Sequence, residues 1–303
     1  MTSTSIVTPP PTTASGRVGS QRGKRRPSLN RRSPVGRAVG YALLLLFLAV
    51  VLMPAYVLIV TSFKSGREIG VNGQWSLPTQ WTLVSWTKAW TVLQPSFVRT
   101  FELAIPVALI SSFIGSANGF VLSRWRFPGA DVAFTLILFG MFIPYQAVMI
   151  PLRQIVQSAG LPPGIPTLIF VHCVYGIPIC TLIFRNYYAT TVPVEVIEAG
   201  RVDGAGLLRT FASIILPISV PGFVVTIIWQ FTSAWNDYLF AIFLSNTSNG
   251  PITIALNALA GAQSPDYAAS MAGALIASLP TLLVYIVLGR WFIGGLMAGS
   301  VKS

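Results

Sequence analysis

Charged residues are scarce in this chain. Only 9% of its 303 residues are Asp, Glu, Lys or Arg, and eight residues are acidic, whereas ordinary soluble domains are roughly one quarter charged. The chain also has a single histidine and two cysteines. So few acids and imidazoles leave little from which to build a metal cluster or an enzyme's nucleophile and base. The composition therefore excludes an ordinary soluble domain and argues against a catalytic one.

Long uncharged runs are what the chain has instead. A helix crosses a hydrocarbon core of roughly 30 Å in about 20 residues, and five uncharged runs reach that length: 38–63, 103–123, 132–152, 210–236 and 267–289. A sixth run, 154–184, is interrupted by prolines, so its spanning part is expected to begin near Pro166. The uncharged segment 238–265 is rich in Asn, Ser, Gly and Pro and is predicted to be mostly an external loop. The fold class predicted is an all-α, polytopic membrane bundle with helices over 38–62, 100–123, 132–152, 166–186, 214–240 and 268–291.

Basic residues are concentrated before the first run. Residues 1–37 carry eight Lys or Arg and no acid, and their Ser, Thr, Pro and Gly content predicts a disordered tail rather than a nucleic-acid-binding domain. No apolar signal-peptide core precedes the first run, so this helix is expected to stay in place. With six spans, fifteen basic residues fall on the side of the tail and five on the other. The positive-inside rule then predicts cytoplasmic termini, a tail over 1–37 and a transmembrane domain over 38–303.

The polar segment 190–217 is predicted to join the fourth and fifth spans on the cytoplasmic side. Pro193 and Glu195 suit the first turn of a short helix, and Glu198 and Arg201 are spaced to pair on one side of it. The glycines that follow remove side-chain bulk where a partner could approach. From these residues alone, a helix that docks a partner and a connecting helix that rests on its own protein both remain open.

The same segment resembles the E-A-A…G…I-x-L-P signature of permease subunits of ATP-binding-cassette (ABC) importers. The resemblance implies a short coupling helix that sits in a cleft of an ATPase dimer. Gly200 stands where the third position of the signature is usually alanine. The positions that the resemblance assigns to ATPase coupling are Glu198, Ala199, Gly200, Asp203, Gly204, Ile214, Leu216 and Pro217.

The last residues, 295–303, resemble the G-L-x-A-G-x-V-K-G ending of carbohydrate importer permeases of the maltose-transporter type, with Ser303 in place of the final glycine. Segments 171–176 and 251–257 are most similar to the glucose/mannose-type branch. The resemblance implies the MetI-like fold of type I ABC importers and a monosaccharide such as glucose or mannose as the substrate. It also implies that the tail contacts the ATPase through Gly299, Val301 and Lys302.

Partners and location follow from the same resemblance. It implies a non-catalytic subunit of a bacterial or archaeal cytoplasmic membrane, paired with a second homologous permease, a cytoplasmic ATPase dimer and an external sugar-binding protein that contacts loop 245–267. ATP and Mg²⁺ belong to the ATPase, and this chain is expected to bind no cofactor or metal. The alternatives are a permease for an oligosaccharide or a non-sugar solute and, from a different class, a standalone secondary transporter, a receptor or a membrane enzyme.

Two groups of polar side chains near the spans are candidates for the substrate pathway. His172, the only histidine, falls in the fourth span, and Trp235, Asn236 and Asp237 close the fifth. An ionisable group in a span suggests function because its burial must be compensated, and an amide, a carboxylate and an aromatic ring suit a sugar. The plainer interpretations are a hydrogen-bonded packing histidine and an interface cap.

Small side chains are expected to line helix contacts. Gly115 and Gly119 lie four residues apart in the second span, which lets another helix approach closely. Cys173 and Cys180 lie seven apart with no other metal ligands around them. They are predicted to be buried thiols rather than a metal site or a disulfide.

Overall fold

The computed structural model describes residues 34–125, 127–261 and 266–297, with side chains up to Gly289. The regular elements in this part of the chain are all helical. Residues up to Val51 and residues from Leu52 onward form separate compact units, and the packing below is that of the second unit. The elements are α1 (Pro34–Ser62), α2 (Gly66–Asn72), α3 (Val84–Arg124), α4 (Ala130–Phe139), η1 (Gly140–Phe142), α5 (Tyr145–Ser158), α6 (Ile165–Thr191), α7 (Val194–Val202), α8 (Leu207–Thr210), η2 (Phe211–Ile215), α9 (Leu216–Ile218), α10 (Val220–Trp235), α11 (Leu239–Leu244), α12 (Ile252–Ala260) and α13 (Tyr267–Met297).

The predicted spans correspond to four continuous helices and two bent pairs. Helices α1, α3, α6 and α13 are each long and apolar enough to cross a membrane. The segment formed by α4 and η1 meets α5 at 98°, and the segment from α8 to α9 meets α10 at 78°. With each bent pair counted as one span, the described part of the chain has six, the number that the sequence predicts.

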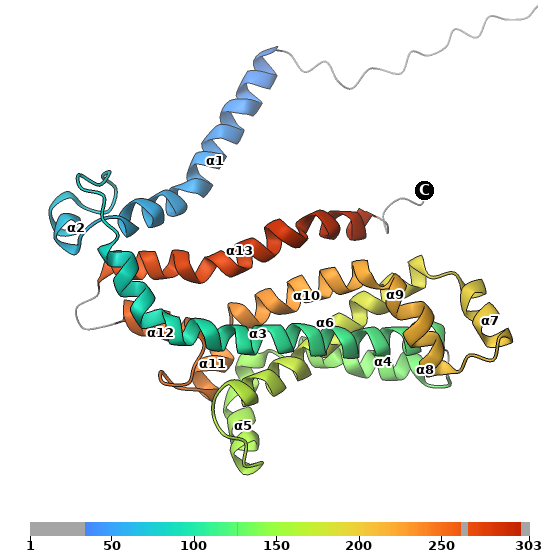
Figure 1. Ribbon diagram of the computed structural model, residues 1–303. Helices are drawn as coiled ribbons and strands as arrows, with labels where there is room; N and C mark the ends of the chain where they lie inside the picture. Colours follow the sequence, from blue (N-terminus) through green and yellow to red (C-terminus); the bar gives the residue numbers. More distant parts are fainter. Residues whose placement is uncertain (1–33, 126, 262–265, 298–303) are drawn as a thin grey trace, which may run out of the picture. The chain divides into compact units, whose positions relative to one another are not determined.

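Helix α3 is the centre of the bundle. It packs against α6, α10, α12 and α13, and α10 also packs against α13 (Figure 1). Helices α7 and α8 lie at one end of this bundle, and α5, α11 and α12 lie at the other. These are called the α7 end and the α11 end below.

Glycines allow α3 and α6 to pack backbone against backbone. A Cβ atom on Gly115 would lie 2.8 Å from the carbonyl carbon of Cys180, and one on Gly119 would lie 2.7 Å from the backbone nitrogen of Arg185. Real Cβ atoms do not approach backbone so closely, so no larger residue fits without moving a helix. The predicted small-residue face is therefore confirmed, and α6 is its partner. Cys180 is buried in this contact, and Cys173 is buried about two turns earlier in α6.

The predicted continuous helix over 132–152 is wrong, because the chain turns at Pro144. Ile143 is extended, with φ −75° and ψ 116°, as the residue before a proline prefers. The helix predicted over 214–240 is also interrupted. It is bent near Ser219, where Val220 and Pro221 start α10, and it ends at Trp235. Prolines that interrupt a pattern of apolar residues thus redirect these two spans.

The prediction of a mostly external loop over 238–265 is corrected by α11 and α12. Both helices bury apolar side chains, including Phe240, Leu244 and Ile252. The backbone N–H of Ile252 donates to the Thr100 hydroxyl of α3 at 2.8 Å, which satisfies one of the free donors at the start of α12. Residues 245–251 connect the two helices without helical structure, and 262–265 lie outside the described residues.

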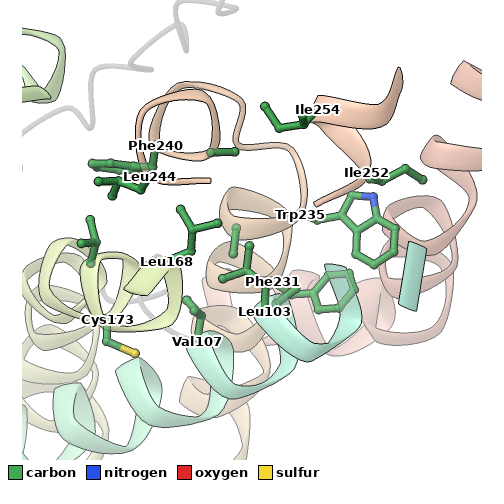
Figure 2. Packing of buried hydrophobic residues seen from close by; sticks show 14 of the residues in the cluster. Leu103, Val107, Leu168, Cys173, Phe231, Trp235, Phe240, Leu244, Ile252 and Ile254 are labelled. Carbon is green, nitrogen blue, oxygen red and sulfur yellow. The ribbon is translucent and has the colours of Figure 1, made fainter. Parts of the chain in front are cut away.

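Two large clusters of buried apolar side chains hold the bundle together, with a smaller third one formed by Ala89, Ala272 and Ile276. The first, at the α11 end, joins Leu103 and Val107 of α3 to Leu168 of α6, Phe231 of α10 and Ile252 of α12 (Figure 2). The second lies at the α7 end, between α3, α6 and the segment from α7 to η2; its buried members are Phe120, Phe184, Tyr188, Val192, Ile197, Phe211 and Ile215. Each end of the bundle therefore has its own core.

The segment between α1 and α3 folds around Lys64, which is fully buried. The ammonium group donates to the carbonyl oxygens of Gly73 at 3.0 Å and Gln74 at 3.3 Å and to the Ser76 hydroxyl at 2.9 Å. Glu68 accepts from the backbone N–H and the hydroxyl of Thr79, and these hydrogen bonds, the backbone one first, hold the pKa of its carboxyl below the usual value. The helices predicted over 38–62 and 100–123 leave this connection without assigned structure, whereas here it is ordered and α3 begins already at Val84.

Candidate functional site

Helix α7 is short because its first and last turns are both fixed by sequence. Glu195 is in its first turn, as predicted, whereas Pro193 lies just before the helix rather than at its first position. At the other end Gly204 has φ +74°, a left-handed conformation that glycine adopts without strain. Its N–H donates to the Arg201 carbonyl at 3.0 Å, and the N–H of Ala205 donates to the Gly200 carbonyl at 2.9 Å. This pair of hydrogen bonds is a Schellman motif.

The eight signature residues divide into an exposed group and a packed group. Glu198, Ala199, Asp203, Gly204 and Pro217 are exposed, whereas Gly200 is buried and Ile214 and Leu216 are half-buried. A Cβ atom on Gly200 would lie 3.0 Å from the Cδ1 atom of Ile214. The packed residues therefore hold α7 against η2, and the exposed ones remain free to contact another molecule.

Arg201 packs against α3 rather than pairing with Glu198. Its guanidinium group lies over the ring of Trp125, 4.4 Å from the ring centroid. Among the residues that the structure describes, no ion pair joins Arg201 to Glu198. The predicted pair is therefore not formed in this structure, and the arginine instead connects α7 to the end of α3 through a cation–π contact.

Two exposed apolar residues near α7 were not predicted as part of the site. The Val202 side chain is 88% exposed and that of Leu208 is 79% exposed. They flank the exposed residues Asp203 and Gly204. No periodicity of the segment distinguishes them, because a helix of nine residues is too short for an apolar face to be recognised.

A cavity of about 420 Å³ lies at the α11 end, where α6 meets the end of α10 and the start of α11. It brings together His172, Asn236 and Asp237, three of the four residues predicted for a substrate pathway. His172 Nε2 lies 3.4 Å from Asp237 Oδ2. The cavity is lined by Tyr145, His172, Tyr175, Gly176, Ile179, Trp229, Gln230, Ser233, Asn236, Asp237, Tyr238, Leu239 and Phe240.

Asp237 also organises the backbone around the cavity. Its carboxylate accepts from the N–H groups of Phe240 at 3.3 Å and Ala241 at 3.0 Å, which satisfies free donors at the start of α11. The Thr253 hydroxyl donates to its carbonyl oxygen at 2.6 Å. The residue therefore caps α11 and attaches α12, which agrees with the plainer interpretation of a cap, while one side of its carboxylate faces His172.

Trp235 does not line the cavity. It is buried at 1% exposure, its indole N–H donates to the Ala277 carbonyl of α13 at 2.8 Å, and its ring packs edge-on against Phe101 and stacks on Phe231. Its position in this structure is that of a core residue between α3, α10 and α13.

The cavity contains polar residues that the sequence did not single out, notably Tyr145, Tyr175 and Gln230. Tyr175 follows His172 by three residues, a spacing that places both on one helix face and could have indicated it. Gln230 is 3% exposed and donates to the Gly176 carbonyl at 2.8 Å. In the described part of the chain, no three His, Cys, Asp or Glu side chains gather as metal ligands would.

Comparisons with known proteins agree with these features. Residues 104–295 match the family described as the binding-protein-dependent transport system inner membrane component. The chain is 32% identical to the xylose/arabinose import permease of Haloferax volcanii, over 86% of this chain and 92% of that protein. It is 31% identical to the glucose import system permease of Saccharolobus solfataricus, over 88% of this chain and 95% of that protein.

A solved structure shares the fold. The crystal structure of a bacterial ABC transporter involved in the import of the acidic polysaccharide alginate matches with a TM-score of 0.74, over 86% of this chain and 99% of that one, at 21% identity. The family match covers the α7 segment, the cavity and both bent spans described above. The chain therefore belongs to the family of binding-protein-dependent transport system inner membrane components and is a membrane-embedded permease subunit of the ABC transporter type.

Proposed function

We propose that this chain is one of two related permease subunits of an ATP-driven sugar importer, with its α7 end in the cytoplasm and its α11 end outside. In this proposal the exposed residues of α7 dock an ATPase dimer that binds ATP and Mg²⁺. The predicted tail contacts, Gly299, Val301 and Lys302, lie outside the described residues and belong to the same proposal. The cavity beside His172 forms this subunit's part of the sugar pathway, open to a sugar-binding protein at the α11 end.

This proposal rests on the division of the signature residues into an exposed group and a packed group. A connecting helix that only rested on its own protein would bury the residues that the signature specifies. Instead, Gly200 and Ile214 fix α7 in place while Glu198, Asp203 and Gly204 project beyond the bundle. The neighbouring Val202 and Leu208 add exposed apolar surface of the kind that marks an interface.

The proposed substrate is a monosaccharide such as glucose or mannose. The cavity supports a small, neutral and polyhydroxylated solute, because its polar groups are an imidazole, two amides, hydroxyls and one carboxylate beside aromatic rings. The two relatives above import different monosaccharides by name, xylose or arabinose and glucose. An oligosaccharide is the second candidate, and the sugar bound by the accompanying binding protein decides between them.

Purification tests the assembly. The tagged chain is extracted from its own membranes in mild detergent, and the proteins that accompany it are identified by mass spectrometry. A second permease and two ATPase copies in stoichiometric amounts are expected. A stable solitary chain would overturn the importer proposal in favour of a secondary transporter or a membrane enzyme.

Substitutions at Gly204 test the docking surface. A Cβ atom there meets nothing within 4 Å, so a large side chain reaches toward a partner without a clash in this chain. Because φ is +74°, tryptophan also strains the backbone, so the melting temperature of Gly204→Trp is measured to show that α7 stays folded. Gly204→Trp and Glu198→Ala are expected to reduce uptake of radiolabelled glucose or mannose in proteoliposomes at least tenfold while ATP hydrolysis continues. Gly204→Asn is the matched control, because asparagine tolerates the left-handed conformation and adds little bulk. Uptake by Gly204→Trp equal to that of Gly204→Asn would contradict the assignment.

A further inference from the structure

A buried chain of hydroxyl groups crosses three helical segments at the α7 end. Tyr188, in the last turn of α6, is fully buried. Its hydroxyl lies 2.6 Å from the Ser116 hydroxyl of α3 and 2.8 Å from the hydroxyl of Ser219, which precedes α10. The Ser219 hydroxyl in turn contacts the Ile215 carbonyl at 2.5 Å.

The direction of this chain follows from its last member. A carbonyl oxygen can only accept, so the proton of Ser219 goes to Ile215. Ser219 must then accept from Tyr188, and Tyr188 accepts from Ser116. Each hydroxyl thus uses its single proton once, and the chain is fully satisfied with Tyr188 as its central member.

These contacts join both ends of segment 190–217 to one point on α3. Tyr188 lies two residues before the segment and Ser219 two residues after it. The surrounding side chains are the apolar second cluster, with Phe120, Phe184 and Phe211. In such surroundings no water replaces a lost hydroxyl, so the hydrogen bonds are stronger and their loss is more costly than at a surface.

The end of α3 also holds the segment elsewhere. The Arg124 guanidinium donates to the carbonyl oxygens of Tyr188 at 2.8 Å, Ala189 at 2.9 Å and Val192 at 2.6 Å, which neutralises the free acceptors at the end of α6. The next residue, Trp125, lies under Arg201 of α7. Helix α3 therefore contacts segment 190–217 near its start, its middle and its end.

We propose that Tyr188 is a positioning residue that makes segment 190–217 and α3 move as one body, so that a displacement of α7 is transmitted into the bundle. This inference rests on the proposed function, in which the segment docks an ATPase. Without the hydroxyl chain, the junction at Ser219 loses its hydrogen-bonded link to α3 and can bend, while Arg124 and Trp125 still hold the start and the middle of the segment. Part of the displacement is then absorbed at this junction, and hydrolysis produces a smaller change at the cavity.

A neighbouring tyrosine supplies the matched control. The Tyr187 hydroxyl donates to the Ile218 carbonyl at 2.8 Å, so it also joins the two ends of the segment, but its proton is used there and not in a hydrogen bond to α3. Tyr188→Phe and Tyr187→Phe each remove a single oxygen atom. Ser116→Ala removes the α3 partner and leaves the Tyr188–Ser219 contact in place, so it tests the link to α3 even if Tyr188→Phe were not to fold.

The experiment uses the purified complex with its ATPase and a cysteine at Ser233, which is exposed and lines the cavity. The rate of Ser233→Cys labelling by N-ethylmaleimide is measured with and without Mg-ATP and orthovanadate, against a parent that retains only the buried Cys173 and Cys180. The change caused by nucleotide is expected to fall at least fivefold in Tyr188→Phe and Ser116→Ala, with no further loss in the double variant. Tyr187→Phe is expected to keep the full change. Retained ATPase subunits and a melting temperature close to that of the parent show that the variants are folded.

Three results would count against the inference, and they distinguish its failure from that of the proposed function. A full nucleotide response in Tyr188→Phe, or equal losses in Tyr188→Phe and Tyr187→Phe, would overturn the inference and leave the proposed function standing. Labelling that ignores nucleotide in the complex with intact Tyr188 would overturn the proposed function and the inference with it.

Discussion

Replacing Gly115 by alanine measures how tightly α3 and α6 are packed. The new Cβ atom would lie 2.8 Å from the Cys180 carbonyl carbon and 3.0 Å from the Thr181 nitrogen. Both are backbone atoms in the middle of a helix, so no flexible side chain can move aside. Overpacking of this kind costs about 1–3 kcal/mol, and part of it is offset because alanine favours a helix over glycine by about 1 kcal/mol.

Gly289→Ala isolates the packing contribution. This glycine also lies in a long helix, α13, but a Cβ atom there meets nothing within 4 Å. The gain in helix propensity is common to both variants, so the difference between them reports crowding alone. That difference is expected to be about 1–3 kcal/mol, with Gly289→Ala the more stable.

Thermal unfolding of the two purified variants in the same detergent provides the assay. A free-energy change of 1 kcal/mol shifts the melting temperature of a domain of this size by roughly 2–4 °C, so the variants should differ by several degrees. Equal melting temperatures would refute the reasoning, since they would mean that α3 and α6 separate without cost and that the small-residue contact does not determine their spacing.

Three further predictions concern other parts of the chain. Gly200→Ala should preserve transport and leave the melting temperature unchanged or slightly higher. The added methyl meets only the end of a flexible side chain, and helix propensity improves by about 1 kcal/mol. A melting temperature lower by several degrees would contradict this prediction. Burial opposes ionisation of Asp266, but its hydrogen bond with Lys88 lowers the pKa of the carboxyl. The carboxylate should therefore stabilise the fold fully above about pH 4 and lose this effect as the pH falls through its folded pKa. Acid titration of Asp266→Asn should lack this loss of stability. Cysteine at Ser248 should react with a membrane-impermeant maleimide in intact cells and cysteine at Ala199 only after permeabilisation; the opposite result would reverse the proposed orientation.

The sequence predicts contacts well where one local feature determines them. Gly115 and Gly119 lie on one face of a helix whatever surrounds it, so a close helix contact could be predicted before its partner was known. The start of α7 could also be predicted to within one residue, because proline and an acidic residue favour the start of a helix for local reasons; the role of Gly204 in ending the helix was not predicted. The break at Pro144 was missed because a proline inside a span can be tolerated when neighbours satisfy the freed carbonyl groups. Whether it bends or breaks the helix depends on packing that the sequence does not display.

Tertiary contacts decide the rest of the site. Ile252 begins a helix because the Thr100 hydroxyl, 152 residues away, accepts its N–H, so the polar composition of 238–265 was a poor guide. His172 and Asp237 were each recognised as polar residues in or near a span, but only the fold places them 3.4 Å apart. Trp235, two residues before Asp237 in the sequence, is instead buried in the core, where its indole N–H donates to the Ala277 carbonyl.

Helices α6 and α10 connect the two ends of the bundle. Helix α6 carries His172 at the cavity and Tyr188 at the hydroxyl chain, sixteen residues apart, which is about 24 Å along a helix. Helix α10 begins beside Ser219 and ends beside Asn236 at the cavity. Helix α3 packs against both helices. The same three helices therefore connect the cavity at one end to the α7 segment at the other. A rigid connection at the α7 end therefore has a direct consequence at the cavity: under the proposed function, a rotation of these helices that α7 drives moves His172 and Asp237 together, relative to the second permease subunit that faces the cavity.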